Sequence, residues 1–440
     1  MNKVLVAGLV VAVGAAGYAG GVAWTAGKVD EAFATQIDQL SDAYAGQANI
    51  SYEGTSGAFS SDYQVSIEIN DLPEDMVEDL VAEFGTSSLL LDVNFKHGLF
   101  SSISTSTLAD TPLRTKLKEI QANAGEEFLS VETRYSYDLG SEQVLIDGNL
   151  SLAALSYSED ADNFSLAASE GTYSLTGETF DISLEIGELK VDSDDGSLNL
   201  SGVSLTETGT LYADDPMMTT AFDMLISADT FSFQDADRNM DISGFKVTAD
   251  QKTEGDRTLI GVGYGASEIQ IQGPDIKEQV SFTPNMHLVL DVDFGAFYDL
   301  TKQIAELQRT NPAQLEDPFV MMGMLGGLTG KGMGLEIDDL SIGLKGSKVQ
   351  ATADLDMQPF TMQEAMMQQQ EMLQKVDLDA QLVIPTELLE AIATLDPEFD
   401  PSVLDVAVMQ GMLVQDEQGY RGELTVKDGQ VVLNGTPLPL

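Results

Sequence analysis

Apolar and polar residues alternate along most of this chain, from about residue 50 to its end. In the segment 63–69, Tyr63, Val65, Ile67 and Ile69 alternate with polar residues. The same pattern recurs over 180–186, 197–205, 335–338 and 351–356. A period of two places every second side chain on one face, and it therefore predicts antiparallel strands with one buried and one solvated face.

Turn-forming pairs interrupt the alternating segments. They are Asp147-Gly148, Glu170-Gly171, Asp195-Gly196 and Asp428-Gly429. Each pair favours a tight connection between strands. No fixed repeat length emerges, so a propeller or a solenoid is not supported.

Helical patterns are fewer and gather in the last third. Helices are predicted to open at Pro73, Pro112, Pro385 and Pro401, and over 294–309 and 359–376, with a strand at 378–384. The sequence thus predicts an α+β fold dominated by β-structure. We expect one or more large, curved antiparallel sheets with a few helices, preceded by one N-terminal transmembrane helix.

The segment 4–24 contains no charged residue. As a helix it would be about 31 Å long, close to the thickness of a bilayer's hydrocarbon core. Lys3 precedes it and acidic residues follow it, which places the N-terminus in the cytoplasm. The predicted organisation is an anchor over 1–27, a stalk helix over 28–48 and a β-rich periplasmic domain over 49–440, richer in helices from about 294. The anchor includes Val4, Leu5, Leu9, Val13, Gly17, Gly21 and Trp24.

Two alternatives concern this segment. Ala19-Gly20-Gly21 resembles a signal-peptide cleavage site, but the apolar run continues past it to Trp24, which favours an uncleaved anchor. Gly17 and Gly21 have the spacing of the small residues at which two membrane-spanning helices pack together, so a homodimer is one hypothesis. Glycine is frequent in this segment, and chance is the preferred explanation of that spacing.

The chain is strongly acidic: it contains 72 Asp and Glu and only 21 Lys and Arg, which gives a net charge of −51. Such a surface repels nucleic acids and anionic lipid headgroups. Self-repulsion destabilises the folded state unless salt screens it, so a salty compartment is expected. The chain has no cysteine, which excludes disulfides, thiolate catalysis and Cys-ligated zinc.

Several short segments occur in the order found in a known family. These are the opening Met-Asn-Lys with its glycine-rich span, Phe59-Ser60-Ser61, Lys96-His97-Gly98-Leu99-Phe100, Leu382-Val383-Ile384-Pro385 and 429–435. Together they resemble the YdgA-like family, bacterial proteins anchored in the inner membrane that contain a domain of unknown function. Leu99 stands where the family pattern has proline. The resemblance implies an envelope location and supplies no catalytic residues.

Candidates for chemistry are few. The two histidines, His97 and His287, are expected at strand ends in structural roles. Two acidic segments, 192–196 and 235–241, could offer oxygen ligands to calcium, but hairpin turns are the preferred interpretation. With 72 acids, close carboxylate pairs arise by chance. We therefore expect no enzyme, and assign no catalytic, cofactor-binding or metal-binding residue.

Two surfaces could bind a partner. Methionine-rich segments form one, through Met321, Met322, Met324, Leu325, Met362 and Met366. Core packing explains them by default, and a deformable surface for lipid tails or a protein is the sharper hypothesis. Arg114, Lys116 and Lys118 form a basic cluster on a predicted helix, either solvated or facing anionic headgroups.

Three functions follow from these observations. The first is a membrane-tethered periplasmic module that binds a lipid or an envelope protein in an apolar concavity. The second is a structural or assembly factor that self-associates. The third is a carboxylate-dependent hydrolase of envelope polysaccharide.

Overall fold

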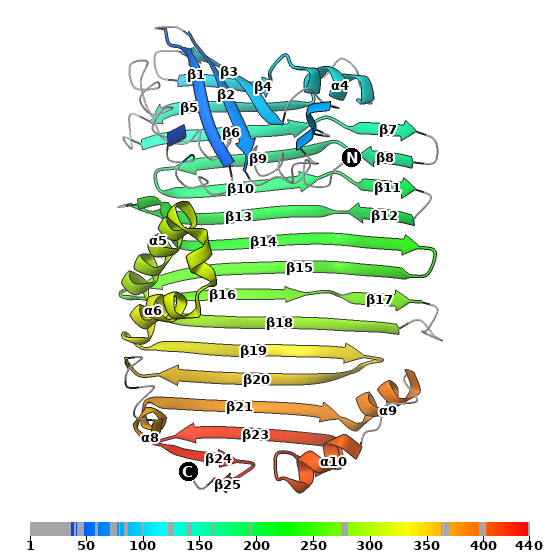
Figure 1. Ribbon diagram of the computed structural model, residues 1–440, viewed down its shortest axis with the longest axis vertical. Helices are drawn as coiled ribbons and strands as arrows, with labels where there is room; N and C mark the ends of the chain where they lie inside the picture. The colour runs from blue at the N-terminus through cyan, green and yellow to red at the C-terminus, as the bar shows by residue number, and fades with distance from the viewer. Residues whose placement is uncertain are drawn as a thin grey trace. The chain divides into compact units, whose positions relative to one another are not determined.

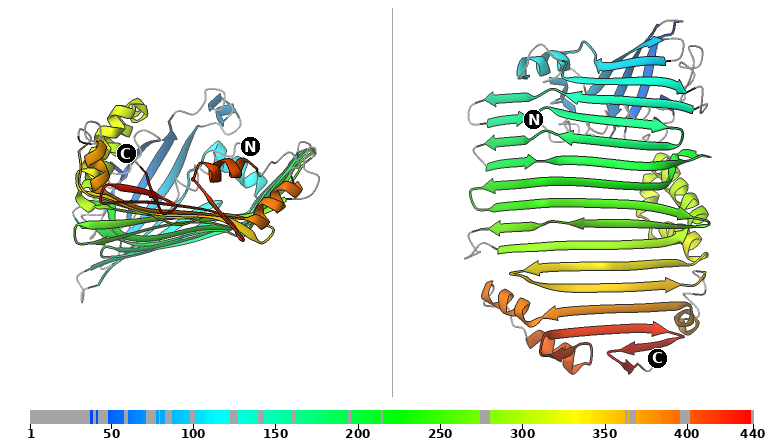
Figure 2. Two further views of the ribbon diagram at one scale, coloured as in Figure 1. Left: turned by 90° about the horizontal axis from the view of Figure 1, so that it is seen from below. Right: turned by 180° about the vertical axis from the view of Figure 1, so that it is seen from behind.

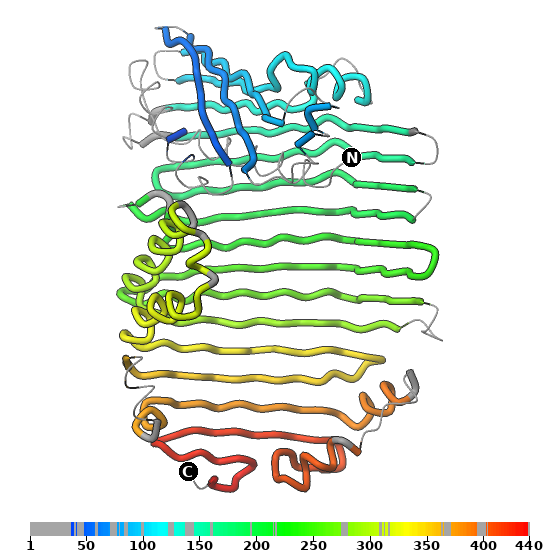
Figure 3. Tube along the Cα trace, viewed as in Figure 1, coloured from blue at the N-terminus to red at the C-terminus, as the bar shows by residue number. Residues whose placement is uncertain are grey.

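The computed structural model describes most of the chain beyond its N-terminal segment. The described residues are 37–38, 41, 48–57, 60–70, 77–78, 80–82, 87–97, 101–121, 127–138, 143–159, 162–193, 196–213, 215–273, 280–361, 364, 369–395 and 402–438. Contacts divide the chain into two units. Figures 1 and 3 show the course of the chain, coloured from blue near the N-terminus to red near the C-terminus. Unit 1 comprises Met1–Ser193, Gly202–Met217 and Ile304–Leu315, and unit 2 comprises Asp194–Ser201, Met218–Gln303 and Glu316–Leu440. The single domain predicted over 49–440 thus contains parts of both units.

Unit 1 is built on antiparallel strands. They are β1 (Ala48–Thr55), β2 (Ser60–Ile69), β3 (Ser88–His97), β4 (Ser101–Leu108), β5 (Leu129–Asp138), β6 (Gln143–Leu152), β7 (Leu155–Glu159), β8 (Asp162–Leu166), β9 (Ser169–Thr176), β10 (Thr179–Ile186), β11 (Leu189–Ser193) and β13 (Val203–Tyr212). The pairing order is β1-β2-β3-β4-β5-β6-β9-β10-β13, and β7-β8-β11 form a second, shorter series.

The core of unit 1 follows from the predicted alternation. Val65 and Ile67 of β2 are buried against Leu91 and Val93 of β3, their register partners or near neighbours. Helix α4 (Pro112–Ile120) covers this core with Leu113 and Leu117, and its N-terminus is capped by the Thr111 side chain.

Unit 1's strands are interrupted at neighbouring positions. β6 and β7 are separated by two alanines, β8 and β9 by Ala167 and Ala168, and β10 and β11 by Gly187 and Glu188. The amide of Ala167 donates to the carbonyl of Glu188 at 2.9 Å, so the backbone stays paired across the break. A Cβ on Gly187 would lie 2.3 Å from the carbonyl oxygen of Ala167, so glycine is required at this position.

Unit 2 contains the longest strands. They are β12 (Gly196–Ser201), β14 (Asp215–Asp235), β15 (Asn239–Glu254), β16 (Arg257–Gly265), β17 (Glu268–Gln272), β18 (Val280–Asp293), β19 (Met333–Leu344), β20 (Ser347–Met357), β21 (Val376–Pro385), β22 (Val414–Asp416), β23 (Gly419–Lys427), β24 (Gln430–Leu433) and β25 (Thr436–Pro437). β14 belongs to unit 2 from Met218 on. The order is β12-β14-β15, then β16 and β17 end to end, then β18-β19-β20-β21-β23-β24-β25, all antiparallel.

The helices of the later part are α5 (Phe294–Thr310), η1 (Pro312–Glu316), α6 (Pro318–Thr329), α8 (Gln369–Met372), η2 (Leu373–Lys375), α9 (Thr386–Leu395) and α10 (Ser402–Met409). In Figure 2 (left), α6, α9 and α10 rise from the same face of the unit 2 sheet. The prediction of a β-dominated fold with antiparallel sheet and few helices is confirmed.

Of three turns predicted from the sequence, one forms and two do not. Asp428 and Gly429 form the predicted hairpin turn, with φ of 51° and 76°. Asp147-Gly148 and Glu170-Gly171 were wrongly predicted as turns, because both pairs lie inside strands. At Gly148 the missing side chain makes room for the ring of Tyr173, since a Cβ there would lie 1.9 Å from that ring.

Candidate functional site

The two faces of the unit 2 sheet differ sharply in chemistry. Across β16, β18 and β19, Val262 is in register with Leu288, and Leu288 with Ile337. On the next strands Ala353 is opposite Ala380, and Ala380 opposite Leu424. We call this side the apolar face, and its middle part the apolar strip. The strip comprises Val247, Ala249, Val262, Tyr264, Met286, Leu288, Ile337, Leu340, Ile342, Ala351, Ala353, Leu378, Ala380 and Leu424.

Among the residues that the structure describes, helices cover only the margins of the apolar face. Leu388 and Ala391 of α9 pack with Leu344 of β19 at one end. Leu413, after α10, packs with Leu389 and Tyr420 in a neighbouring cluster. At the opposite strand ends lie α5 and α6, where the Thr301 hydroxyl donates to the sulfur of Met218 at 3.6 Å (Figure 1).

The apolar strip between these margins stays open. Ile342 is 50 % exposed, Leu340 43 %, Tyr264 42 % and Val262 36 %. The remaining strip residues are half-buried. Large exposed apolar patches on soluble domains commonly mark binding surfaces, so the strip is a candidate site.

The opposite face, which we call the polar face, carries an acidic row. Glu336 of β19 is opposite Asp354 of β20, which is in turn opposite Asp379 of β21. Hydrogen bonding to Asp338 and its negative charge raise the pKa of Glu336, with a smaller contribution from Asp354. Like charges directly opposite each other destabilise a sheet, so this row opposes folding at neutral pH.

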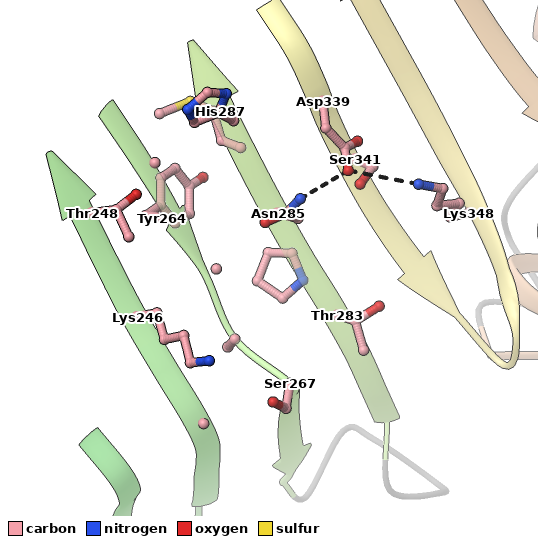
Figure 4. A pocket seen from close by; sticks show the side chains of 16 residues that line it. Lys246, Thr248, Tyr264, Ser267, Thr283, Asn285, His287, Asp339, Ser341 and Lys348 are labelled. Carbon is pink, nitrogen blue, oxygen red and sulfur yellow. Dashed lines mark hydrogen bonds and ion pairs between the residues drawn. The ribbon is translucent and has the colours of Figure 1, made fainter. Parts of the chain in front are cut away.

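A polar hollow of about 470 Å³ lies on the polar face between β15 and β20 (Figure 4). Asn285 donates to Asp339 at 2.8 Å, and the ammonium of Lys348 is 3.7 Å from the same carboxylate. Desolvation opposes ionisation of Asp339, but Asn285, Ser341 and Lys348 together outweigh it and lower the pKa of the carboxyl group. Lys246 reaches toward the hollow from β15.

The two histidines occupy different surroundings. His287 lines the polar hollow, and its Nδ1 is 2.7 Å from Asp338. His97 lies at the end of β3, with Nε2 3.0 Å from the Ser61 hydroxyl and Nδ1 3.2 Å from that of Ser102. A serine next to a histidine has the geometry of a nucleophile and its base. Ser61 is only 1 % exposed, however, so no substrate reaches it and the contact is a buried polar pair.

Other predicted residues can now be placed. Met324 is buried in α6, Met321 and Met322 are half-buried, and Leu325 is exposed. Met362 and Met366 lie outside the described residues, as do the predicted anchor residues Val4, Leu5, Leu9, Val13, Gly17, Gly21 and Trp24. Within the described part of the chain, no helix is long and apolar enough to cross a membrane.

The basic cluster and the second acidic segment have local partners. Arg114 and Lys118 both pair with Glu127, the latter at 3.7 Å. The carboxylate of Asp235 accepts hydrogen bonds from the amides of Asp237 and Arg238, at 2.8 and 2.7 Å. That arrangement is a side-chain-stabilised turn between β14 and β15. A hairpin turn was the preferred interpretation of the segment 235–241.

The polar hollow and most of the apolar strip were not predicted from the sequence. The signal for the hollow is the alternation of Gly261, Gly263 and Gly265 in β16, which leaves one face of that strand without side chains. The strip could be anticipated as an apolar face, but its exposure depends on where the helices pack.

Comparison with known proteins yields a family and no activity. The model of a family described as "Bacterial protein of unknown function (DUF945)" matches residues 1–440. Neither the curated proteins nor the solved structures provide a match to the chain. Because the family model spans the whole sequence, the chain belongs to this bacterial family of unknown function.

Proposed function

We propose that the protein is a membrane-tethered envelope protein that binds lipid acyl chains on the apolar strip of unit 2. The observation that supports this most is the continuity of the strip. It crosses seven strands, from β15 to β23, while the helices that the structure describes cover only the strand ends on either side of it. At about 4.8 Å per strand, the strip is about 29 Å long. An extended acyl chain spans about half of a bilayer's hydrocarbon core, which is about 30 Å thick, so the strip is long enough to hold one.

Burial of the strip supplies the driving force. Each 100 Å² of apolar surface that a ligand covers contributes about 2.5 kcal/mol, before the costs of association. Ala351, Ala353 and Ala380 lie side by side on β20 and β21. Their short side chains leave room next to Leu340 and Ile342 for a hydrocarbon chain to lie against the sheet.

The chemistry of the strip favours hydrocarbon over protein. A peptide laid on it would lose water from its amides and carbonyls without gaining partners, because the strip's side chains are aliphatic except for Tyr264 and Met286. The central strands are paired on both sides, so they offer no free edge. A second copy would also carry a net charge of −51, and the repulsion between the two copies opposes face-to-face pairing.

The tether and the compartment rest on the sequence. The uncharged segment 4–24 supports an anchor in the inner membrane, and the acidic, cysteine-free composition is compatible with a periplasmic domain. A tether would hold the strip near its ligand, because a linked site meets membrane lipids at high local concentration.

Photo-crosslinking of the full chain in its host membrane tests the proposal. p-Benzoylphenylalanine replaces Ile342 in the strip or, as the matched control, Gln350 of the neighbouring strand on the polar face. We expect phospholipid adducts, identified by mass spectrometry, from position 342 and none from position 350. Adducts only with proteins, including a second copy, or equal lipid labelling at both positions would refute lipid binding by the strip.

A charge placed in the strip provides an independent test. Leu340→Asp puts a carboxylate where acyl chains would lie, so co-purifying lipid should be lost. Leu340 is 43 % exposed, and the melting temperature should therefore change little. Gln350→Asp adds the same charge on the polar face and should retain lipid. Full lipid retention by a folded Leu340→Asp variant would contradict the proposal.

A further inference from the structure

The polar hollow has a floor of glycines. In one row across the strands, Lys246 is opposite Gly265, Gly265 opposite Asn285, and Asn285 opposite Ser341. In the next row, Thr283 is opposite Gly343, and Gly343 opposite Lys348. Asn285 therefore has Gly265 beside it and Lys246 one strand further out. Thr283 has Gly343 and then Lys348 in the same arrangement on its other side.

Polar side chains lie down over these glycines. A Cβ on Gly263 would be 2.6 Å from the Thr248 hydroxyl, and one on Gly343 would be 2.2 Å from the Thr283 hydroxyl. A Cβ on Gly265 would be 2.9 Å from the Asn285 side-chain oxygen. The glycines thus permit orientations of hydroxyl and amide groups that any larger residue would block, and they keep the hollow open.

The hydroxyls around the hollow are available. The side-chain hydroxyls of Thr248, Ser267 and Thr283 have no hydrogen-bond partner among the residues that the structure describes. Together with Asn285, they surround the space seen in Figure 4. Such groups can both donate to and accept from a ligand.

The charge of the hollow is unusual for this chain. Only 21 of its residues are Lys or Arg, against 72 acids, yet Lys246 and Lys348 approach one hollow from opposite sides. Lys246 has no ion-pair partner within the described residues. Lys348 forms an ion pair with Asp339 at 3.7 Å, and an ammonium group carries three N–H donors, so donors remain for a ligand. Both ammonium groups can therefore donate to an anion.

We infer that the polar hollow binds a small hydroxylated anion, of the class of a polyol phosphate. Its anionic group would be held by Lys246 and Lys348, since lysine binds phosphate well as a point charge. Its hydroxyls would bond to Thr248, Ser267 and Thr283. The volume of the hollow, about 470 Å³, lies in the range of small-molecule binding sites and is large enough for a polyol phosphate. This site lies on the face opposite the apolar strip, and the inference does not depend on lipid binding by the strip.

Calorimetric titration of the full chain with sn-glycerol 3-phosphate tests this inference. Glycerol and inorganic phosphate are the comparison probes, because each carries one half of the proposed chemistry. We expect sn-glycerol 3-phosphate to bind more tightly than either. No binding at millimolar concentration, or equal binding of glycerol, would overturn the inference.

Variants locate the binding in the hollow. Lys246→Gln and Lys348→Gln should each weaken binding about tenfold, since each removes a charge-assisted hydrogen bond. Lys427→Gln, an exposed lysine of β23 outside the hollow, makes the same change in charge and should have no effect. Gly343→Ala should weaken binding by displacing the Thr283 hydroxyl. Equal losses in all four variants would indicate non-specific attraction and overturn the assignment.

The same chemistry could reach the hollow as a free metabolite or as a lipid headgroup. Dihexanoyl phosphatidylglycerol, which presents a glycerol phosphate diester, distinguishes these sources. Binding of this lipid that Lys246→Gln weakens would identify a headgroup site. Binding of sn-glycerol 3-phosphate alone would identify a site for the free monoester.

Discussion

Neutralising Asp354 should stabilise unit 2, because this residue sits between two other acids. Glu336 is directly opposite on β19, and Asp379 is directly opposite on β21. Side chains opposite each other in a sheet are about 5 Å apart, so each repulsion amounts to about 0.8 kcal/mol at low ionic strength. Asp354→Asn removes both, for a gain of about 1.5 kcal/mol in the free energy of unfolding.

The assay is thermal unfolding of the full chain at two salt concentrations. For a unit of this size, about 1.5 kcal/mol corresponds to an increase in melting temperature of about 3–6 °C. At 1 M salt the Debye length falls to about 3 Å, and the difference from the wild type should shrink below about 1 °C. Because the pKa of Glu336 is raised, its neutral form stabilises the folded state at acidic pH, and this stabilisation is lost as pH rises through that pKa.

Asp241→Asn is the matched control. Asp241 is on β15 of the same unit, and its cross-strand neighbours, Ser232 and Gln270, are uncharged. This variant changes the net charge by the same amount without relieving a direct repulsion. If Asp241→Asn stabilises as much as Asp354→Asn, or if salt leaves the difference unchanged, cross-strand repulsion is not the cause.

Three further predictions concern unit 1. Gly148→Ala should lower the melting temperature, because its Cβ would overlap the Tyr173 ring, and the loss should be smaller in a Tyr173→Ala background. Burial raises the pKa of Tyr135 and of Tyr173, so the free energy of unfolding should stay constant up to about pH 10 and fall above it. Tyr173→Phe should reduce that fall in circular-dichroism melts. An unchanged fall would show that ionisation of Tyr173 does not cause it. Ser61→Ala should cost about 1–3 kcal/mol in denaturant unfolding, because Nε2 of His97 loses the Ser61 hydroxyl while Nδ1 keeps that of Ser102; an unchanged midpoint would refute that role.

Local sequence predicted the elements whose formation depends on neighbouring residues. The alternation at 63–69 and 180–186 falls within β2 and β10, and the turn at Asp428-Gly429 forms as expected. The segment 197–205 was predicted as one strand but is split at Gly202, whose φ is +62°. Leu198 and Leu200 precede that glycine and Val203 and Leu205 follow it, so the alternation shifts by one residue there and marks the break.

Long-range packing decided what the sequence left open. Gly148 was interpreted as a turn residue because Asp-Gly is a turn signal, whereas its role is to admit Tyr173, which lies 25 positions later and pairs with it across β6 and β9. The hollow likewise requires the register that brings Lys246 and Lys348 to one place. Neither pairing can be deduced from spacing along the chain.

The aligned strand breaks of unit 1 have a consequence for local unfolding. Each break divides a long strand into two halves that pair within their own series, β6-β9-β10 on one side and β7-β8-β11 on the other. The shorter series has fewer paired amides per strand, so it can open while the longer series stays folded. Native-state hydrogen exchange should then separate two populations of amides, with Phe164 and Val191 exchanging before Ile146 and Phe180.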